Sequence, residues 1–135
     1  MTAIIQKEAD AIRGINVTDA FEDAVNALLN CKGRIITTGI GKAGYIANKF
    51  ASTLASTGTP AFFIHPAEAG HGDMGMITKP DLIVAFSTSG KSNEVIEMLQ
   101  IARGLGIESV IGITSHAESP LRDLSKIILD MGSDI

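Results

Sequence analysis

The sequence predicts a doubly wound α/β fold in which a five-stranded parallel sheet lies between two layers of helices. Short apolar runs rich in Ile, Val and Phe recur five times along the chain, and helical patterns separate them. The runs lack the polar alternation of a half-exposed strand, so both faces of each strand are expected to be covered. Right-handed crossovers then place helices on both faces, with an expected strand order of 2-1-3-4-5.

Length, composition and charge fit a globular protein with one core. The 135 residues are 45% hydrophobic and 19% charged and include no Trp, which suits a core of Ala, Ile, Leu and Val. The net charge of -4 is spread along the chain without a Lys/Arg block, which argues against a nucleic-acid partner. The start of the chain does not resemble a signal peptide, and no run approaches the ~20 apolar residues of a membrane span. We therefore expect a cytoplasmic protein with no membrane partner.

Two helices are expected before the first strand. Residues 2–13 and 18–31 carry apolar side chains at helical spacing, and Thr18 is a candidate N-cap for the second helix. Cys31 ends this pattern and is the one cysteine of the chain, which excludes an internal disulfide and a Cys-based metal cluster. We expect it to be a small buried packing residue.

Strands and helices then alternate to the end of the chain. The expected strands are 34–37, 61–64, 81–86, 109–113 and 126–129. The expected helices between them are 42–57, 92–104 and a short one from Pro120, and a Gly- and His-rich segment, 65–76, follows the second strand. Pro120 is a strong helix start because its ring fits the first helical position and the preceding Ser119 can cap the helix.

The first strand-to-helix loop, "TTGIGKAG", has glycines at 39, 41 and 44 in the G-x-G-x-x-G spacing of dinucleotide sites. The acid that would bind the ribose is absent near the end of the second strand, where His65 stands, so a nicotinamide or flavin cofactor is disfavoured. The P-loop pattern also fails, because Ile36 and Ala43 replace its first Gly and its metal-binding Ser/Thr. The alternative is that the glycines serve only a tight turn and close packing.

The loop after the third strand, "STSGKSNE", has four hydroxyl side chains around one glycine at a helix N-terminus. They belong to Ser87, Thr88, Ser89 and Ser92. Free N–H groups and the helix dipole favour an anion there. In the expected strand order, this loop and the first one flank the point where the order reverses. A phosphorylated small molecule is therefore expected, with Gly39, Gly41 and Lys42 facing the rest of it; a serine-rich turn without a ligand is the alternative.

The segment "HPAEAGHGDMG" brings two histidines and two carboxylates together. A metal site is one interpretation, but the spacing is not H-E-x-x-H and no Cys assists. Proton transfer or binding of sugar hydroxyls by His65 or His71 is favoured, because histidine titrates near neutral pH. His116, in a later turn, is expected to be a surface or hinge residue.

The stretches "GIGKAG", "ASTLASTGTPAFFIHPAEAGHGDMGMI" and "STSGKSNE" closely resemble the sugar isomerase (SIS) domain of bacterial arabinose 5-phosphate isomerases, over about residues 33–131. The resemblance implies a flavodoxin-like fold, a homotetramer, and interconversion of D-ribulose 5-phosphate and D-arabinose 5-phosphate for the octulosonate sugar of lipopolysaccharide or capsule. It implies one SIS domain over 1–135, with N-terminal helices in 1–31 and the sheet core in 33–131. From the same resemblance we expect this sequence to lack the C-terminal helix and the CBS domains that are common in the family.

The resemblance also implies roles for single residues. The four hydroxyl residues of the second loop match the phosphate cradle, and Lys42 and Glu94 match active-site positions. His71 matches a histidine at which zinc binds as an inhibitor, not as a cofactor. The hypothesis is an enediol mechanism without any cofactor. In it Lys42 stabilises the oxyanion, Glu94 or a carboxylate beyond this sequence takes the proton, and His65 or His71 opens the ring or shuttles protons.

Two other functions remain open at this point. SIS domains also occur in regulators that bind phosphosugars without converting them, so a non-catalytic sensor is one alternative. An isomerase of another phosphosugar, such as a hexulose 6-phosphate, is the second, because the loops alone do not select a pentose.

Overall fold

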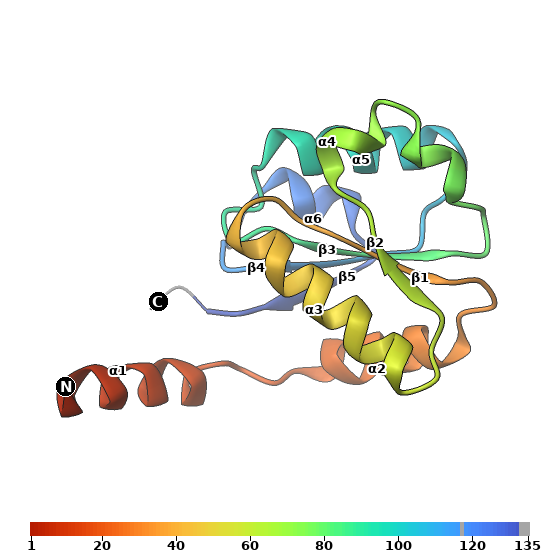
Figure 1. Ribbon diagram of the computed structural model, residues 1–135. Coiled ribbons are helices and arrows are strands. Elements are labelled where there is room, and N and C mark those ends of the chain that lie inside the picture. The colour runs from red at the N-terminus through yellow and green to blue at the C-terminus, as the bar shows by residue number, and fades with distance from the viewer. Residues whose placement is uncertain (117, 133–135) are drawn as a thin grey trace.

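The computed structural model describes residues 1–116 and 118–132, and its centre is a five-stranded parallel sheet in the order β2-β1-β3-β4-β5 (Figure 1). The strands are β1 (Ile35–Thr38), β2 (Ala61–Phe63), β3 (Leu82–Phe86), β4 (Val110–Thr114) and β5 (Ile127–Asp130). The predicted fold class, the parallel arrangement and the strand order are confirmed.

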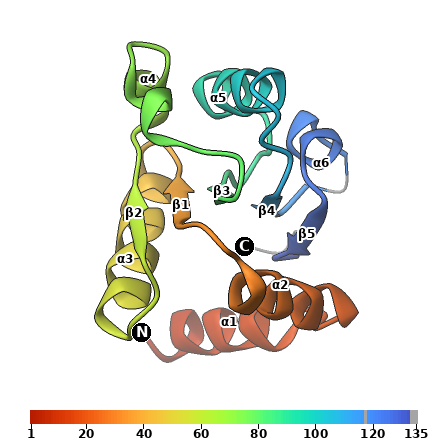
Figure 2. The same ribbon diagram turned by 90° about the vertical axis from the view of Figure 1, so that its right-hand side faces the viewer.

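Helices cover both faces of this sheet, as the second view shows (Figure 2). The longer helices are α1 (Thr2–Arg13), α2 (Asp19–Asn30), α3 (Lys42–Ser56) and α5 (Asn93–Gly104). The shorter ones are α4 (Pro66–Ala69), the 3₁₀ turn η1 (Asp73–Met76) and α6 (Pro120–Leu124). Helices α2 and α3 lie on one face, and α4, α5 and α6 lie on the other.

Successive strand residues enter the two halves of the core. Ile36 and Ile83 pack with the helices of the α5 side, whereas Ile35, Leu82 and Val84 pack with those of the α2 and α3 side. All five side chains are buried, and burying each one contributes roughly 1.5–3 kcal/mol. The uninterrupted apolar strands are therefore explained by burial on both faces.

Helix α1 forms as predicted but contributes no buried residue to the core. Ile5 and Ile12, two of the apolar residues that predicted it, are 63% and 69% exposed. Figure 1 shows the helix extending away from the sheet. Its periodic pattern therefore predicted a helix correctly without predicting a position in the core.

Cys31 is half-buried instead of fully buried, so the expectation of a buried packing residue holds only in part. Its Sγ donates to the Pro80 carbonyl at 3.4 Å, and its side chain packs at the border of the α2-side core. It thus ties the end of α2 to the segment that enters β3.

The Gly- and His-rich segment after β2 is more regular than expected, since it contains α4 and η1. Pro66 occupies the first turn of α4, and His65 caps the helix by accepting the Ala67 N–H on Nδ1 at 3.2 Å. Ala69 and Met74 are buried against the α5-side core. The Xaa-Pro start that predicted α6 is present here too and could have predicted α4.

A buried carboxylate ties β1 to β3 at the amino edge of the sheet. Asp81 is 1% exposed and accepts hydrogen bonds from the backbone N–H groups of Arg34 and Thr78, at 2.7 and 2.8 Å, and from both side chains. Burial alone would raise the pKa of this carboxyl, but the four hydrogen bonds outweigh burial and hold the pKa below its usual value. Arg34 also stacks on the Phe62 ring of β2, at 4.9 Å from its centroid.

No helix within the described residues is long and apolar enough to cross a membrane.

Candidate functional site

The two loops singled out in the sequence leave the sheet at neighbouring points of its carboxyl edge. Thr38 at the end of β1 pairs with Ala85 near the end of β3. The loop into α3 and the loop into α5 therefore start side by side, at the point where the strand order reverses. Ligands of open α/β sheets bind in this position.

Different structural constraints explain why Gly41 and Gly44 of the first loop are glycines. Gly41 has a φ of 62°, in the left-handed region that favours glycine. A Cβ on Gly44 would lie 2.7 Å from the carbonyl oxygen of Gly39, so the helix can approach the loop only without a side chain there. The G-x-G-x-x-G spacing is thus explained by the turn and by close packing of α3, as in the structural alternative considered for it.

A hollow of about 280 Å³ opens beside this loop, next to the end of β2. Its lining residues are Gly39, Gly41, Gly44, Tyr45, Asn48, Phe63 and His65. The structure therefore brings together the predicted residues Gly39, Gly41 and His65 and adds Tyr45 and Asn48, which the sequence reasoning missed. Gly44, Tyr45 and Asn48 follow Gly41 at spacings of three, four and seven residues, so they lie on one face of α3.

The loop into α5 is held by its own hydroxyl groups. The Oγ atoms of Ser87 and Ser92 lie 3.0 Å apart in a hydrogen bond, and Ser89 Oγ accepts the Lys91 N–H at 3.1 Å. Ser87 is buried, Ser89 and Ser92 are half-buried, and Thr88 is exposed. The loop ends at the N-terminus of α5, a helix of 12 residues, so its serine hydroxyls lie where the helix dipole favours an anion.

The four residues expected to do chemistry lie on segments that leave the same edge. Lys42 is the first residue of α3 and is exposed, and Glu94 is the second residue of α5 and is half-buried. His65 precedes α4, and His71 lies in the turn between α4 and η1. Neither Lys42 nor Glu94 belongs to an ion pair among residues 1–116 and 118–132, so both charges are available to a ligand.

The part of the chain that the structure describes contains no group of three His, Cys, Asp or Glu residues that could hold a metal ion. His65 and His71 therefore lie without the further ligands that a tight zinc site requires.

The β4–α6 loop also contacts the serine loop, which the sequence did not predict. The Thr88 carbonyl accepts the Ser115 N–H at 3.0 Å and the Thr114 hydroxyl at 3.1 Å. His116 is exposed, as expected of a surface residue, but its Nδ1 lies 3.2 Å from the same oxygen. Threonine at the end of an apolar run gives no signal in the sequence that would distinguish this role from an ordinary strand position.

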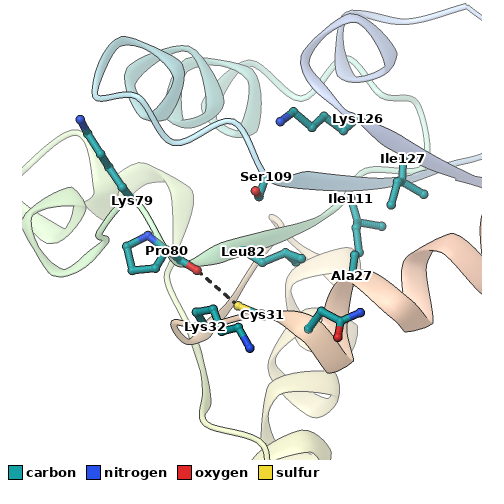
Figure 3. Close-up of a pocket in the computed structure, with 11 residues that line it drawn as sticks. Ala27, Cys31, Lys32, Lys79, Pro80, Leu82, Ser109, Ile111, Lys126 and Ile127 are labelled. Atoms are coloured by element: carbon teal, nitrogen blue, oxygen red, sulfur yellow. Dashed lines mark hydrogen bonds between the residues drawn. The ribbon is translucent and has the colours of Figure 1, made fainter.

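A larger hollow, of about 360 Å³, lies at the opposite, amino edge of the sheet (Figure 3). Its walls come from the end of α2 and from the starts of β3, β4 and β5. Leu82, Ile111 and Ile127 make it largely apolar, and none of the predicted site residues lines it. Because the polar loops are at the carboxyl edge, the smaller hollow there is the better candidate for the chemistry.

The sequence model of the SIS domain family matches residues 28–134. Over 125 residues, 91% of this chain, the sequence is 47% identical to the arabinose 5-phosphate isomerase KdsD of Pseudomonas aeruginosa. Over 111 residues it is 42% identical to the arabinose 5-phosphate isomerase KpsF of Escherichia coli. The matched parts span 38% and 35% of those two proteins, so the chain covers little more than a third of their length.

Two solved structures support the same relationship. A Bacteroides fragilis protein assigned as a phosphosugar isomerase of capsule formation is 43% identical, with a TM-score of 0.91 over 96% of this chain and 70% of that one. The c3406 protein of E. coli CFT073, solved in complex with arabinose 5-phosphate, is 33% identical, with a TM-score of 0.88 over 95% of this chain and 69% of that one. Sequence and fold thus agree over the sheet and both loops, and the chain belongs to the SIS domain family.

Proposed function

We propose that this chain is the sugar-isomerase domain of an arabinose 5-phosphate isomerase and interconverts D-ribulose 5-phosphate and D-arabinose 5-phosphate. The observation that carries the proposal is the serine loop at the N-terminus of α5, beside the β1–α3 loop, in a chain 47% identical to KdsD. A phosphate on the serine loop would place the sugar against the first loop and Lys42. The sugar-phosphate complex of the related E. coli protein supports this choice of ligand.

In the proposed site, the serine loop binds the phosphate and leaves the sugar carbons free to react. The hydroxyls of Ser89 and Ser92 and the exposed Thr88 can donate to phosphate oxygens, while the partial positive charge at the start of α5 favours the dianion. Ser87 is buried and hydrogen bonded to Ser92, so its contribution is to fix the Ser92 hydroxyl.

The proposed reaction moves a proton between C1 and C2 of the open-chain sugar. A base removes the C1 proton of the ketose, the carbonyl oxygen takes up negative charge, and an enediol forms that is protonated at C2. Lys42 is exposed and without an ion-pair partner among the described residues, so its ammonium can stabilise that oxygen. Glu94, or a carboxylate outside this sequence, is the base, and His65 or His71 opens the ring of the aldose or shuttles protons.

For the whole protein, we propose a cytoplasmic homotetramer whose product enters the octulosonate sugar of lipopolysaccharide or capsule. The assignment of the Bacteroides relative to capsule formation supports the metabolic role. Tyr45 and Ile46 support an assembly, because these apolar side chains are 78% and 56% exposed on α3, close to the site.

The test is to incubate the purified chain with ribulose 5-phosphate and to follow arabinose 5-phosphate by NMR. The proposal expects slow equilibration of the two sugars without added metal or nucleotide, and none with a hexulose 6-phosphate. Binding of the sugar phosphate without conversion would support either a sensor or a fragment that lacks its base, and a chain extended at its C-terminus would distinguish the two. Conversion of the hexulose alone would contradict the pentose assignment.

A further inference from the structure

We propose that Thr114 is a positioning residue that holds the serine loop, residues 87–92, in its phosphate-binding form through the carbonyl of Thr88. The inference rests on the proposed phosphate-binding role of that loop. It concerns a residue on β4 that is 1% exposed and therefore acts without touching the sugar.

The carbonyl of Thr88 joins the serine loop to the end of β4 and to the β4–α6 loop by hydrogen bonds. Its oxygen accepts the Ser115 N–H at 3.0 Å and the Thr114 hydroxyl at 3.1 Å, and His116 Nδ1 lies 3.2 Å away. A carbonyl oxygen has two lone pairs, so the two shorter contacts already satisfy it. Of the two side chains involved, the hydroxyl of Thr114 is the buried one, whereas His116 is exposed.

A second backbone hydrogen bond, which with those at Thr88 we call the tethers, holds the serine loop at Gly90. The Gly90 carbonyl accepts the N–H of Leu121, in the first turn of α6, at 3.1 Å. Ser119, predicted to cap α6, occupies the N-cap position, but its hydroxyl makes no cap bond and is buried without a hydrogen-bond partner in the described part of the chain. A Cβ on Gly90 would lie 2.2 Å from Ser119 Oγ and 3.1 Å from Thr114 Oγ1, so the two loops are in contact along this line.

The tethers have an electrostatic consequence for an anion. Peptide bonds of the described residues are all trans, so the C=O and the following N–H of each peptide point in opposite directions. When the carbonyls of Thr88 and Gly90 are drawn toward the β4–α6 loop, the N–H of Ser89 is turned away from that loop. Partial negative charges are thereby kept on the side of Thr114 and α6, and the Ser89 N–H is left for an anion bound on the opposite side of the loop.

The test compares Thr114→Val, which removes the hydroxyl but keeps the shape, with Thr114→Ser, which keeps the hydroxyl. Thr78→Val is the matched control, because Thr78 Oγ1 donates to Asp81 Oδ2 at 3.1 Å at the amino edge of the sheet, away from the site. Thr114→Val removes the hydrogen bond to the Thr88 carbonyl and a longer one, at 3.4 Å, that the hydroxyl accepts from the His116 N–H. In the purified chain we expect it to raise KM for ribulose 5-phosphate, and Ki for inorganic phosphate, about five- to tenfold, the effect of losing the bond to Thr88. Its kcat should change less than twofold, and Thr114→Ser and Thr78→Val should keep both constants.

Amide hydrogen exchange tests whether Thr114 stabilises the serine loop, and it does so without substrate. The N–H groups of Gly90 and Ser115 are hydrogen bonded at 3.0 Å each and should exchange faster in Thr114→Val than in Thr114→Ser. Equal exchange in the two variants would overturn the inference, even if the chain shows no turnover. An equal rise of KM in both variants, or a fall of kcat with unchanged KM, would also overturn it. Failure of the unsubstituted chain to bind any sugar phosphate, with exchange as expected, would contradict the proposed function instead.

Discussion

The buried carboxylate of Asp81 should be a position at which a single substitution of the same shape lowers the stability of the fold. Replacement by Asn keeps the shape but exchanges one acceptor oxygen for an NH₂ group. With the NH₂ on the side of Oδ2, it would face the Thr78 N–H and the Arg34 guanidinium, which are both donors. With the NH₂ on the side of Oδ1, it would face only the Arg34 N–H, 2.7 Å away in the wild type, so this orientation costs less.

The second orientation sets the magnitude of the effect. It removes one hydrogen bond to a charged acceptor, worth about 1.5–3 kcal/mol, and weakens the remaining bonds by removing the charge. We expect Asp81→Asn to lower the free energy of unfolding by about 2–4 kcal/mol at pH 7, out of the roughly 5–15 kcal/mol typical of a domain. Asp130→Asn is the control, because its ion pair with Arg122 has a half-exposed carboxylate and should cost about 0–1 kcal/mol.

The pH dependence supplies an independent check. The pKa of Asp81 in the folded chain lies below its ordinary value of 3.8, so its stabilising contribution is complete above pH 3.8 and is lost as the pH falls through the folded-state pKa. Urea unfolding followed by circular dichroism should therefore show a gap between wild type and Asp81→Asn that is constant near neutral pH and narrows in acid. A loss below 1 kcal/mol at pH 7, or a gap that stays constant in acid, would refute the reasoning.

Three further predictions concern the proposed site. Lys42→Ala should lower kcat by about 10²- to 10³-fold, as for loss of one oxyanion donor, while Ki for inorganic phosphate changes little. If Ki rose by as large a factor as kcat fell, Lys42 would instead bind the phosphate. Ser89→Ala should raise KM about fivefold with kcat nearly unchanged, because the proposed function assigns its hydroxyl to the phosphate. Ser56→Ala, at an exposed position on α3, should change neither constant. Added Zn²⁺ should inhibit turnover, and His71→Asn should shift the inhibition curve at least tenfold to higher zinc; an unshifted curve would exclude His71 as a zinc ligand.

The sheet and the location of the loops were predictable because burial on both faces imposes a simple pattern. Strands such as 81–86 are apolar without alternation, and order 2-1-3-4-5 then places the ends of β1 and β3 together. The position of α1 was not predictable in this way. A helical period shows that one face is apolar, but it does not show which surface, if any, lies against that face.

The parts of the site that were missed depend on contacts between distant segments. Thr114 and Thr88 are 26 residues apart, and nothing in either local sequence indicates that a hydroxyl of one meets the carbonyl of the other. Tyr45 and Asn48 could have been predicted from the sequence, since both lie on the face of α3 that begins at Gly41. Backbone carbonyls, which decide the shape of the serine loop, carry no signature in the amino-acid sequence at all.

The ion pair of Asp81 and Arg34, here called the amino-edge anchor, and the polar loops lie at opposite ends of the same strands. Asp81 and Arg34 precede β3 and β1, and strands of four or five residues at about 3.3 Å each separate them from the loops by roughly 13–17 Å. Substitutions that far apart usually add in their effects on free energy. Substitutions in the carboxyl-edge loops, where the proposed sugar site lies, should therefore leave the stabilising contribution of the amino-edge anchor, Asp81 and Arg34, unchanged.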